Sequence, residues 1–80
     1  MAKIKEFFRV TKTASPHPTE VECGYQVILT QNGALLQLST YGSDGRQSEK
    51  KVSQTLQLDR ERAAELLQII TEAFPDLKDS

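Results

Sequence analysis

The stretch "QVILTQNGALLQLSTY", residues 26–41, decides the fold. Apolar and polar residues alternate on both sides of an Asn-Gly pair, which is the pattern of two strands joined by a tight turn. A type I′ turn needs positive φ at both central residues, and Asn-Gly accepts this most readily. The stretch therefore predicts an antiparallel hairpin that turns at Asn32 and Gly33 and pairs Leu29 with Leu36.

Strands are also predicted on either side of this hairpin. Residues 3–12 are rich in aromatic and β-branched residues, and residues 51–58 alternate in polarity, so we expect both to be strands. Residues 13–20 contain two prolines in three positions and indicate a loop, because proline denies a ladder hydrogen bond. With residues 21–30 and 34–41, these segments predict a four-stranded antiparallel sheet.

A helix is predicted after the sheet. Residues 60–74 contain no glycine or proline and carry apolar residues at helical spacing. Asp59 is a favourable N-cap, and Pro75 would end the helix. The expected fold is α+β with the order β-β-β-β-α. It forms one domain over residues 1–75, its helix covers one face of the sheet, and residues 76–80 are a frayed tail.

The predicted register divides the sheet into two faces. Leu29 opposite Leu36 and Val27 opposite Leu38 would point toward the helix. The other face would be open and would combine cations, amides, hydroxyls and aromatic rings. Its expected side chains are Lys3, Lys5, Phe7, Arg9, Gln26, Ile28, Thr30, Leu35, Gln37, Ser39, Tyr41, Ser53, Thr55 and Gln57.

Such a face suits a single-stranded nucleic acid, because cations bind phosphates and exposed rings stack on unpaired bases. The simpler alternative is an ordinary half-solvated sheet whose polar side chains face water. The predicted nucleic-acid contacts are Lys3, Lys5, Phe7, Arg9, Gln37, Ser39, Tyr41, Arg46, Lys50, Lys51, Ser53 and Thr55.

The net charge of −1 over 80 residues hides a strong segregation of charge. Residues 1–12 carry a net +3 and residues 46–51 a net +2, whereas residues 13–45 and residues 59–80 each carry −3. A polyanion responds to a local basic patch and not to the total, so the near-neutral chain remains compatible with nucleic acid.

The connection "TYGSDGRQSEKK", residues 40–51, is longer than a hairpin needs. We expect its tip to be a flap that closes its basic residues on a phosphate backbone, with Tyr41 at the base as a stacking platform. The alternative is a solvated hairpin tip in which Tyr41 only covers Gly24.

Catalytic and metal-binding patterns are missing from the sequence. His17 has only Cys23 as a soft partner, and we interpret it as a loop histidine. Cys23 has no base or orienting group that would mark it as a nucleophile. The "GSDG" at residues 42–45 lacks the strand–loop–helix context of a phosphate-binding loop. We therefore expect no enzyme, metal, cofactor or small-molecule substrate.

A single cysteine and the absence of a long apolar run indicate where the protein works. One cysteine makes no internal disulfide, which favours a reducing compartment, and no segment is apolar enough to span a membrane. We expect a cytoplasmic protein without membrane contact, and association with the nucleoid would fit a role on DNA.

A chain of this length buries a modest core and often relies on dimerisation. Apolar residues of the predicted helix extend beyond one stripe, so we expect a homodimer formed through the helix. The expected dimer interface is Leu66, Ile69, Ile70 and Ala73.

The segment "LLQLSTYGSDGRQSEKKVSQTLQLDRERAAELLQII", residues 35–70, resembles the C-terminal half of the positive-cofactor-four type transcriptional coactivators and their small bacterial homologues. The shared features are a strand ending in an aromatic residue, an Asp-containing tip, a basic return and a short step into a helix. The resemblance implies a β-β-β-β-α fold, helix-mediated homodimers and single-stranded DNA bound across the outer sheet face.

The resemblance also assigns positions. Tyr41 occupies or adjoins the place of the base-stacking aromatic, and the basic residues of the long hairpin correspond to Arg46, Lys50 and Lys51. Lys5 and Arg9 correspond by topology alone. The chain departs from the family in having no tryptophan.

The function expected from the sequence is a non-catalytic module that binds single-stranded DNA, or RNA, in transcription, replication or repair. The alternative is a protein-interaction module that uses the same open face and has no nucleic-acid role. Salt-dependent binding of a single-stranded oligonucleotide would separate the two.

Overall fold

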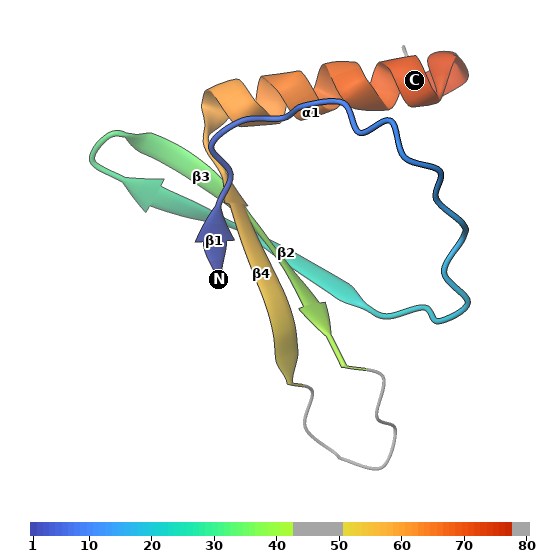
Figure 1. The fold of residues 1–80 in the computed structure, drawn as a ribbon. Coiled ribbons are helices and arrows are strands. Elements are labelled where there is room, and N and C mark those ends of the chain that lie inside the picture. The colour runs from blue at the N-terminus through green and yellow to red at the C-terminus, as the bar shows by residue number, and fades with distance from the viewer. Residues whose placement is uncertain (43–50, 78–80) are drawn as a thin grey trace.

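A computed structural model describes residues 1–42 and 51–77 (Figure 1). Within these residues the sheet has four strands in the order β1-β4-β3-β2. The elements in chain order are β1 (Ala2–Lys3), β2 (Cys23–Thr30), β3 (Gly33–Tyr41), β4 (Val52–Leu58), α1 (Arg60–Ala73) and the short 3-10 helix η1 (Pro75–Leu77). The α+β class with a C-terminal helix is confirmed.

The prediction of a fully antiparallel sheet is wrong, because β1 runs parallel to β4. The predicted strand over residues 3–12 is reduced to Ala2–Lys3, and the ladder ends where the Ile4 amide donates to the Gln57 carbonyl at 2.9 Å. The chain then leaves the sheet and passes beside α1, where the Lys5 carbonyl accepts a hydrogen bond from Arg62. A contact with the helix therefore replaces the strand pairing that the alternation predicted.

The hairpin turns one residue earlier than predicted. Thr30 pairs with Gly33, so the turn residues are Gln31 and Asn32, and Gly33 follows with φ of 124°. The Thr30 hydroxyl fixes this turn, because it accepts from the Asn32 amide at 3.1 Å and donates to the Gly33 carbonyl at 2.7 Å. One position of positive φ, which glycine adopts freely, is thus placed just after the turn.

The change of turn shifts the β2–β3 register by two residues, so that Val27 lies opposite Leu36 and not Leu38. A shift of two keeps every side chain on its predicted face, because side chains alternate with a period of two. The prediction that Val27, Leu29, Leu36 and Leu38 share one face is therefore confirmed.

Helix α1 begins and ends close to its predicted bounds. Asp59 is the N-cap, and its side chain accepts a hydrogen bond from the Arg62 amide at 2.8 Å, which satisfies one of the free donors of the first turn. The helix ends at Ala73, and the Phe74 amide still donates to the Ile70 carbonyl. Asp76 and Leu77, expected in a frayed tail, belong to η1 instead; residues 78–80 lie outside the described part.

The helix does not cover the apolar face of the sheet as expected. Figure 1 shows α1 lying across one end of the sheet, with the N-terminal segment alongside it. A single residue, Asp59, joins β4 to α1, so the helix starts where the strand ends. Among the described residues only Leu58 is a fully buried large apolar side chain, at 2% exposure. Val27 and Leu29 remain 63% and 83% exposed.

Candidate nucleic-acid interface

A row of amide side chains crosses the polar face of the sheet, the face opposite Val27 and Leu29. The register pairs Gln37 with Gln26 on one side and with Gln57 on the other, and Gln57 with Lys3 at the edge. Gln57 Nε2 donates to Gln37 Oε1 at 2.8 Å. This bond holds both amides in place and leaves Gln37 Nε2 and Gln57 Oε1 for a ligand, because neither bonds another described residue.

A second row on the same face is closed to ligands. Ser39 lies opposite Gly24 and Thr55 in the register, and the Ser39 and Thr55 hydroxyls lie 3.1 Å apart in a hydrogen bond. Both residues are only 7% exposed. The two hydroxyls satisfy each other in one copy, so neither offers a free group to a ligand in this arrangement.

Tyr41 lies on the polar face, next to this second row, and is half-buried. Its ring rests on Gly24: a Cβ added at Gly24 would lie 3.2 Å from Tyr41 Cε1. The ring therefore covers the glycine, as the simpler alternative held, and its half-burial leaves part of it accessible. A hollow of about 220 Å³ beside it is lined by Gly24, Tyr25, Gln26, Gln37, Ser39 and Tyr41.

Ser53 is not on the polar face as predicted. The β3–β4 register slips between Thr40 and Tyr41, so that Thr40 pairs with Gln54 and Tyr41 with Val52. This irregularity brings the Ser53 hydroxyl to 2.9 Å from the Thr40 hydroxyl. Thr40 belongs to the apolar face by alternation, so Ser53 points away from Tyr41.

Lys5, Phe7 and Arg9 are also separated from the sheet. They were predicted on the outer face of the first strand, but they follow Ile4, where the chain has already left the ladder. Phe7 and Arg9 instead border a hollow of about 480 Å³ against α1, which Glu65 and Ile69 line from the helix. The structure therefore does not bring these three residues together with Tyr41.

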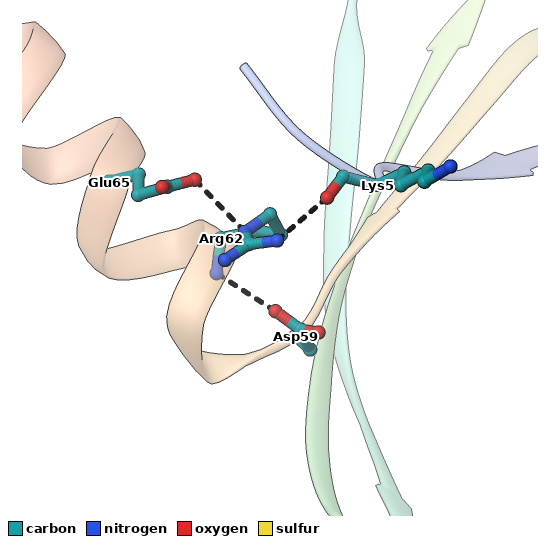
Figure 2. A network of polar contacts seen from close by, with 4 residues as sticks. All are labelled: Lys5, Asp59, Arg62 and Glu65. Carbon is teal, nitrogen blue, oxygen red and sulfur yellow. Dashed lines mark hydrogen bonds and ion pairs between the residues drawn. The ribbon is translucent and has the colours of Figure 1, made fainter.

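Arg62 is the residue that holds the N-terminal segment beside the helix (Figure 2). Its Nη1 donates to the Lys5 carbonyl at 2.6 Å, and its Nε lies 2.9 Å from Glu65 Oε1. The side chain is only 24% exposed, so these contacts are partly shielded from water. This role was not predicted from local sequence patterns, because the contact joins residues 57 positions apart.

The remaining basic residues of the predicted site lie at or beyond the end of the hairpin. Lys51 is exposed, and its carbonyl accepts from the Gly42 amide at 3.0 Å, which places it at the base of the connection next to Tyr41. Arg46, Lys50 and the predicted flap tip lie outside the described residues.

Side chains of the metal-binding type do not gather in the described ranges 1–42 and 51–77: no group of three or more His, Cys, Asp or Glu residues could hold an ion. His17 accepts the Thr19 amide at Nδ1 within its own loop, and Cys23 is exposed. Within the same two ranges, no helix has the length and apolar character needed to cross a membrane.

A large exposed apolar surface of the sheet was not predicted from the sequence. Tyr25, Val27 and Leu29 of β2 are 79%, 63% and 83% exposed, and Leu56 of β4 shares their face. The signal that could have revealed it was the single residue between β4 and the helix, which is too short a connection to fold the helix back over β2.

No family model, curated protein or solved structure matches the chain. The resemblance to the coactivator family therefore stays a prediction.

Proposed function

We propose that this chain is a non-catalytic module that binds single-stranded nucleic acid, DNA in the first place and RNA as a second ligand. The observation that carries the proposal is the placement of Tyr41, the ordered Gln37–Gln57 amide pair and Lys3 on one face of one sheet. The resemblance of residues 35–70 to single-stranded DNA-binding coactivators supports the same function and suggests work in transcription, replication or repair.

The ring, the amides and the lysines can each contact a different part of an unpaired strand. A base can stack on the accessible part of the Tyr41 ring, a contact worth about 1–3 kcal/mol per base. The free ends of the amide pair can bond base edges, since an amide offers both a donor and an acceptor. Lys3 at the β1 edge of this face, and Lys51 at the base of the connection that follows Tyr41, are both exposed and supply charge for the phosphates.

In this proposal the module is a homodimer with the helix at the interface. Ile69 and Ile70 are 41% and 37% exposed, although both are large and apolar, and Ala73 is exposed beside them. Leu66 is half-buried. An unsatisfied apolar helix surface of this kind is stabilised when a second copy covers it.

A protein-interaction module without a nucleic-acid role is the second candidate function. The observation that favours it is the exposure of Tyr25, Val27 and Leu29, because contiguous apolar surface marks protein contacts more than nucleic-acid contacts. The two candidates differ in the response to salt, since phosphate contacts release counterions and apolar contacts do not.

The test is a fluorescence-anisotropy titration of labelled oligo-dT with the purified protein, beside a duplex of the same length. We expect salt-dependent binding of the single strand and a several-fold loss of affinity in Tyr41→Ala. Tyr41→Phe is the matched control, because it keeps the ring over Gly24 and should bind like the parent. Equal, weak binding by all three proteins would contradict the proposal.

The dimer is tested separately by sedimentation of Ile69→Glu. If Ile69 faces a second copy, a buried carboxylate at the interface should halve the sedimenting mass relative to the parent protein while the circular dichroism stays native. A parent protein that sediments at 9.0 kDa would contradict the helix-mediated dimer.

A further inference from the structure

The two edge strands of the sheet differ in length. One edge is β1, a strand of two residues, and such a short edge offers little for another chain to pair with. The other edge is β2, which has eight residues and no strand on its outer side among the described residues.

The outward hydrogen-bonding groups of β2 can be assigned from the ladder. The Tyr41 amide donates to the Glu22 carbonyl, so Glu22 turns its backbone groups toward β3. Successive residues of a strand turn their backbone groups to opposite sides. The groups of Tyr25, Val27 and Leu29 therefore point away from β3, and no backbone bond joins them to another described element.

Edge strands in soluble proteins are normally protected by charge, proline, a bulge or a covering segment. The described residues provide none of these for β2. Its sequence "CGYQVILT" contains no charged residue and no proline, and its register with β3 runs without interruption from Cys23 to Thr30. Its outward residues also carry the exposed apolar side chains Tyr25, Val27 and Leu29.

We propose that β2 pairs antiparallel with β2 of a second copy of this chain, so that one sheet continues through both copies. With Val27 on the two-fold axis, Tyr25 of each copy lies opposite Leu29 of the other. Outward groups then meet only outward groups, and each N–H finds a C=O.

The chemistry of the strand favours a second copy over an unrelated strand. The register that pairs the backbone also pairs Tyr25 with Leu29 and Val27 with Val27 on one face, which buries apolar side chains against each other. The absence of charge between Cys23 and Thr30 removes the repulsion that self-pairing of a charged strand would bring. The contact adds burial that one copy lacks, since Leu58 is its one fully buried large apolar residue within the described ranges.

This contact deepens the proposed function, because it rests on self-association, but it uses a surface distinct from α1. A two-fold axis perpendicular to the sheet keeps the polar faces of both copies on the same side. The Tyr41 rings of two copies would therefore border one continuous surface, on which a single strand could contact both.

The first test compares the masses of Val27→Pro and Val27→Ala by sedimentation equilibrium. The Val27 amide points outward, so proline removes no β2–β3 hydrogen bond there and is tolerated on an edge, yet it blocks pairing with another strand. Alanine shortens the same side chain and keeps the amide. We expect the proline variant to have half the mass of the alanine variant; equal masses of two folded proteins would overturn the proposal.

The second test needs no variant and decides the matter if Val27→Pro fails to fold. Amide hydrogen exchange is measured in the unchanged protein at several concentrations. We expect the amides of Tyr25, Val27 and Leu29 to become protected as concentration rises, while the Ile28 amide, which faces β3, is protected throughout. Rapid exchange of the three outward amides at every concentration would overturn the proposal.

The same samples separate this inference from the nucleic-acid function. If the parent protein does not bind oligo-dT but Val27→Pro halves the mass, strand pairing stands and the nucleic-acid proposal fails. If oligo-dT binds in a Tyr41-dependent way while the mass is unchanged by proline, the nucleic-acid proposal stands and strand pairing fails.

Discussion

The polar face and the apolar face of the sheet satisfy their side chains in different ways. On the polar face, Ser39 and Thr55 bond each other and are almost fully buried. On the apolar face, Tyr25 and Leu29 are among the most exposed side chains described. Polar groups on neighbouring strands can satisfy one another within a single sheet, whereas apolar groups need a second layer. One copy of the chain therefore satisfies the buried hydroxyls of its polar face, but it leaves the apolar side chains of β2 in contact with water.

The contrast continues within the apolar face itself. Leu58, at the end next to the helix, is buried, while Leu29, near the hairpin turn, is exposed. Both are leucines on the same face of one sheet, but Leu58 lies on the interior strand β4 beside the helix, whereas Leu29 lies on the edge strand β2.

The largest expected effect is a loss of stability on substitution of Leu58, the buried leucine of the apolar face. Leu58→Ala should lower the free energy of unfolding by about 2–5 kcal/mol, because it leaves a cavity in the covered part of the core. Leu29→Ala should change it by no more than about 0.5 kcal/mol in dilute solution, where one copy is isolated. Urea denaturation of both variants measures the difference. Equal losses at the lowest concentration would mean that the chain covers Leu29 by itself.

The next effect concerns the segment that lies beside the helix instead of on the apolar face. Arg62→Ala should cost about 1.5–3 kcal/mol of stability, because it removes the hydrogen bond to the Lys5 carbonyl and the ion pair with Glu65. Arg60→Ala, at an exposed helical position, is the control and should have almost no effect. Thermal melts followed by circular dichroism provide the comparison, and indistinguishable melting temperatures would show that the Arg62 contacts do not hold the segment.

A smaller effect is expected on the salt dependence of oligo-dT binding when the two lysines proposed to contact phosphates are removed. The double variant Lys3→Ala, Lys51→Ala should reduce the slope of log affinity against log salt by about 1.4, or roughly 0.7 for each phosphate contact. Lys5→Ala, Arg9→Ala removes the same charge from the segment beside α1 and should leave the slope unchanged. The reverse pattern in oligo-dT titrations would place the strand along the helix, as the sequence-based assignment of Lys5 and Arg9 implied.

The smallest effect tests how Tyr41 is held. In Gly24→Ala the new Cβ would meet Tyr41 Cε1 at 3.2 Å, so the ring must shift by a few tenths of an ångström. Stability should change by less than about 1 kcal/mol, because alanine is favoured over glycine in a strand while the contact is tight. Oligo-dT affinity should fall modestly. Unchanged affinity, beside a clear loss in Tyr41→Ala, would show that Gly24 does not position the ring.

Local patterns in the sequence predicted the central hairpin, β4 and the helix well. Alternation placed Val27 and Leu36 on one face even though the turn was assigned one residue too late, because a register error of two leaves the faces unchanged. Asp59 and Pro75 marked the helix because capping and chain termination depend on adjacent residues.

The errors arose where distant residues compete for the same segment. Residues 3–12 alternate like a strand, but Arg62, far along the chain, bonds the Lys5 carbonyl and draws the segment to the helix. For this reason Phe7 and Arg9 lie against α1 and not on the sheet face where they were predicted. Ser53 was misplaced because a slip in one ladder reverses the direction of a side chain, and alternation alone cannot reveal such a slip.

The central claim, that the polar face and not the apolar face receives the nucleic acid, has a direct test in the tyrosine fluorescence. The chain has two tyrosines and no tryptophan, and Tyr41 and Tyr25 lie on opposite faces. Tyr25→Phe leaves Tyr41 as the only emitter, and Tyr41→Phe leaves Tyr25. On titration with oligo-dT, stacking of a base on Tyr41 should quench the emission of Tyr25→Phe and leave that of Tyr41→Phe unchanged. Quenching confined to Tyr41→Phe, or absent from both variants, would contradict the account.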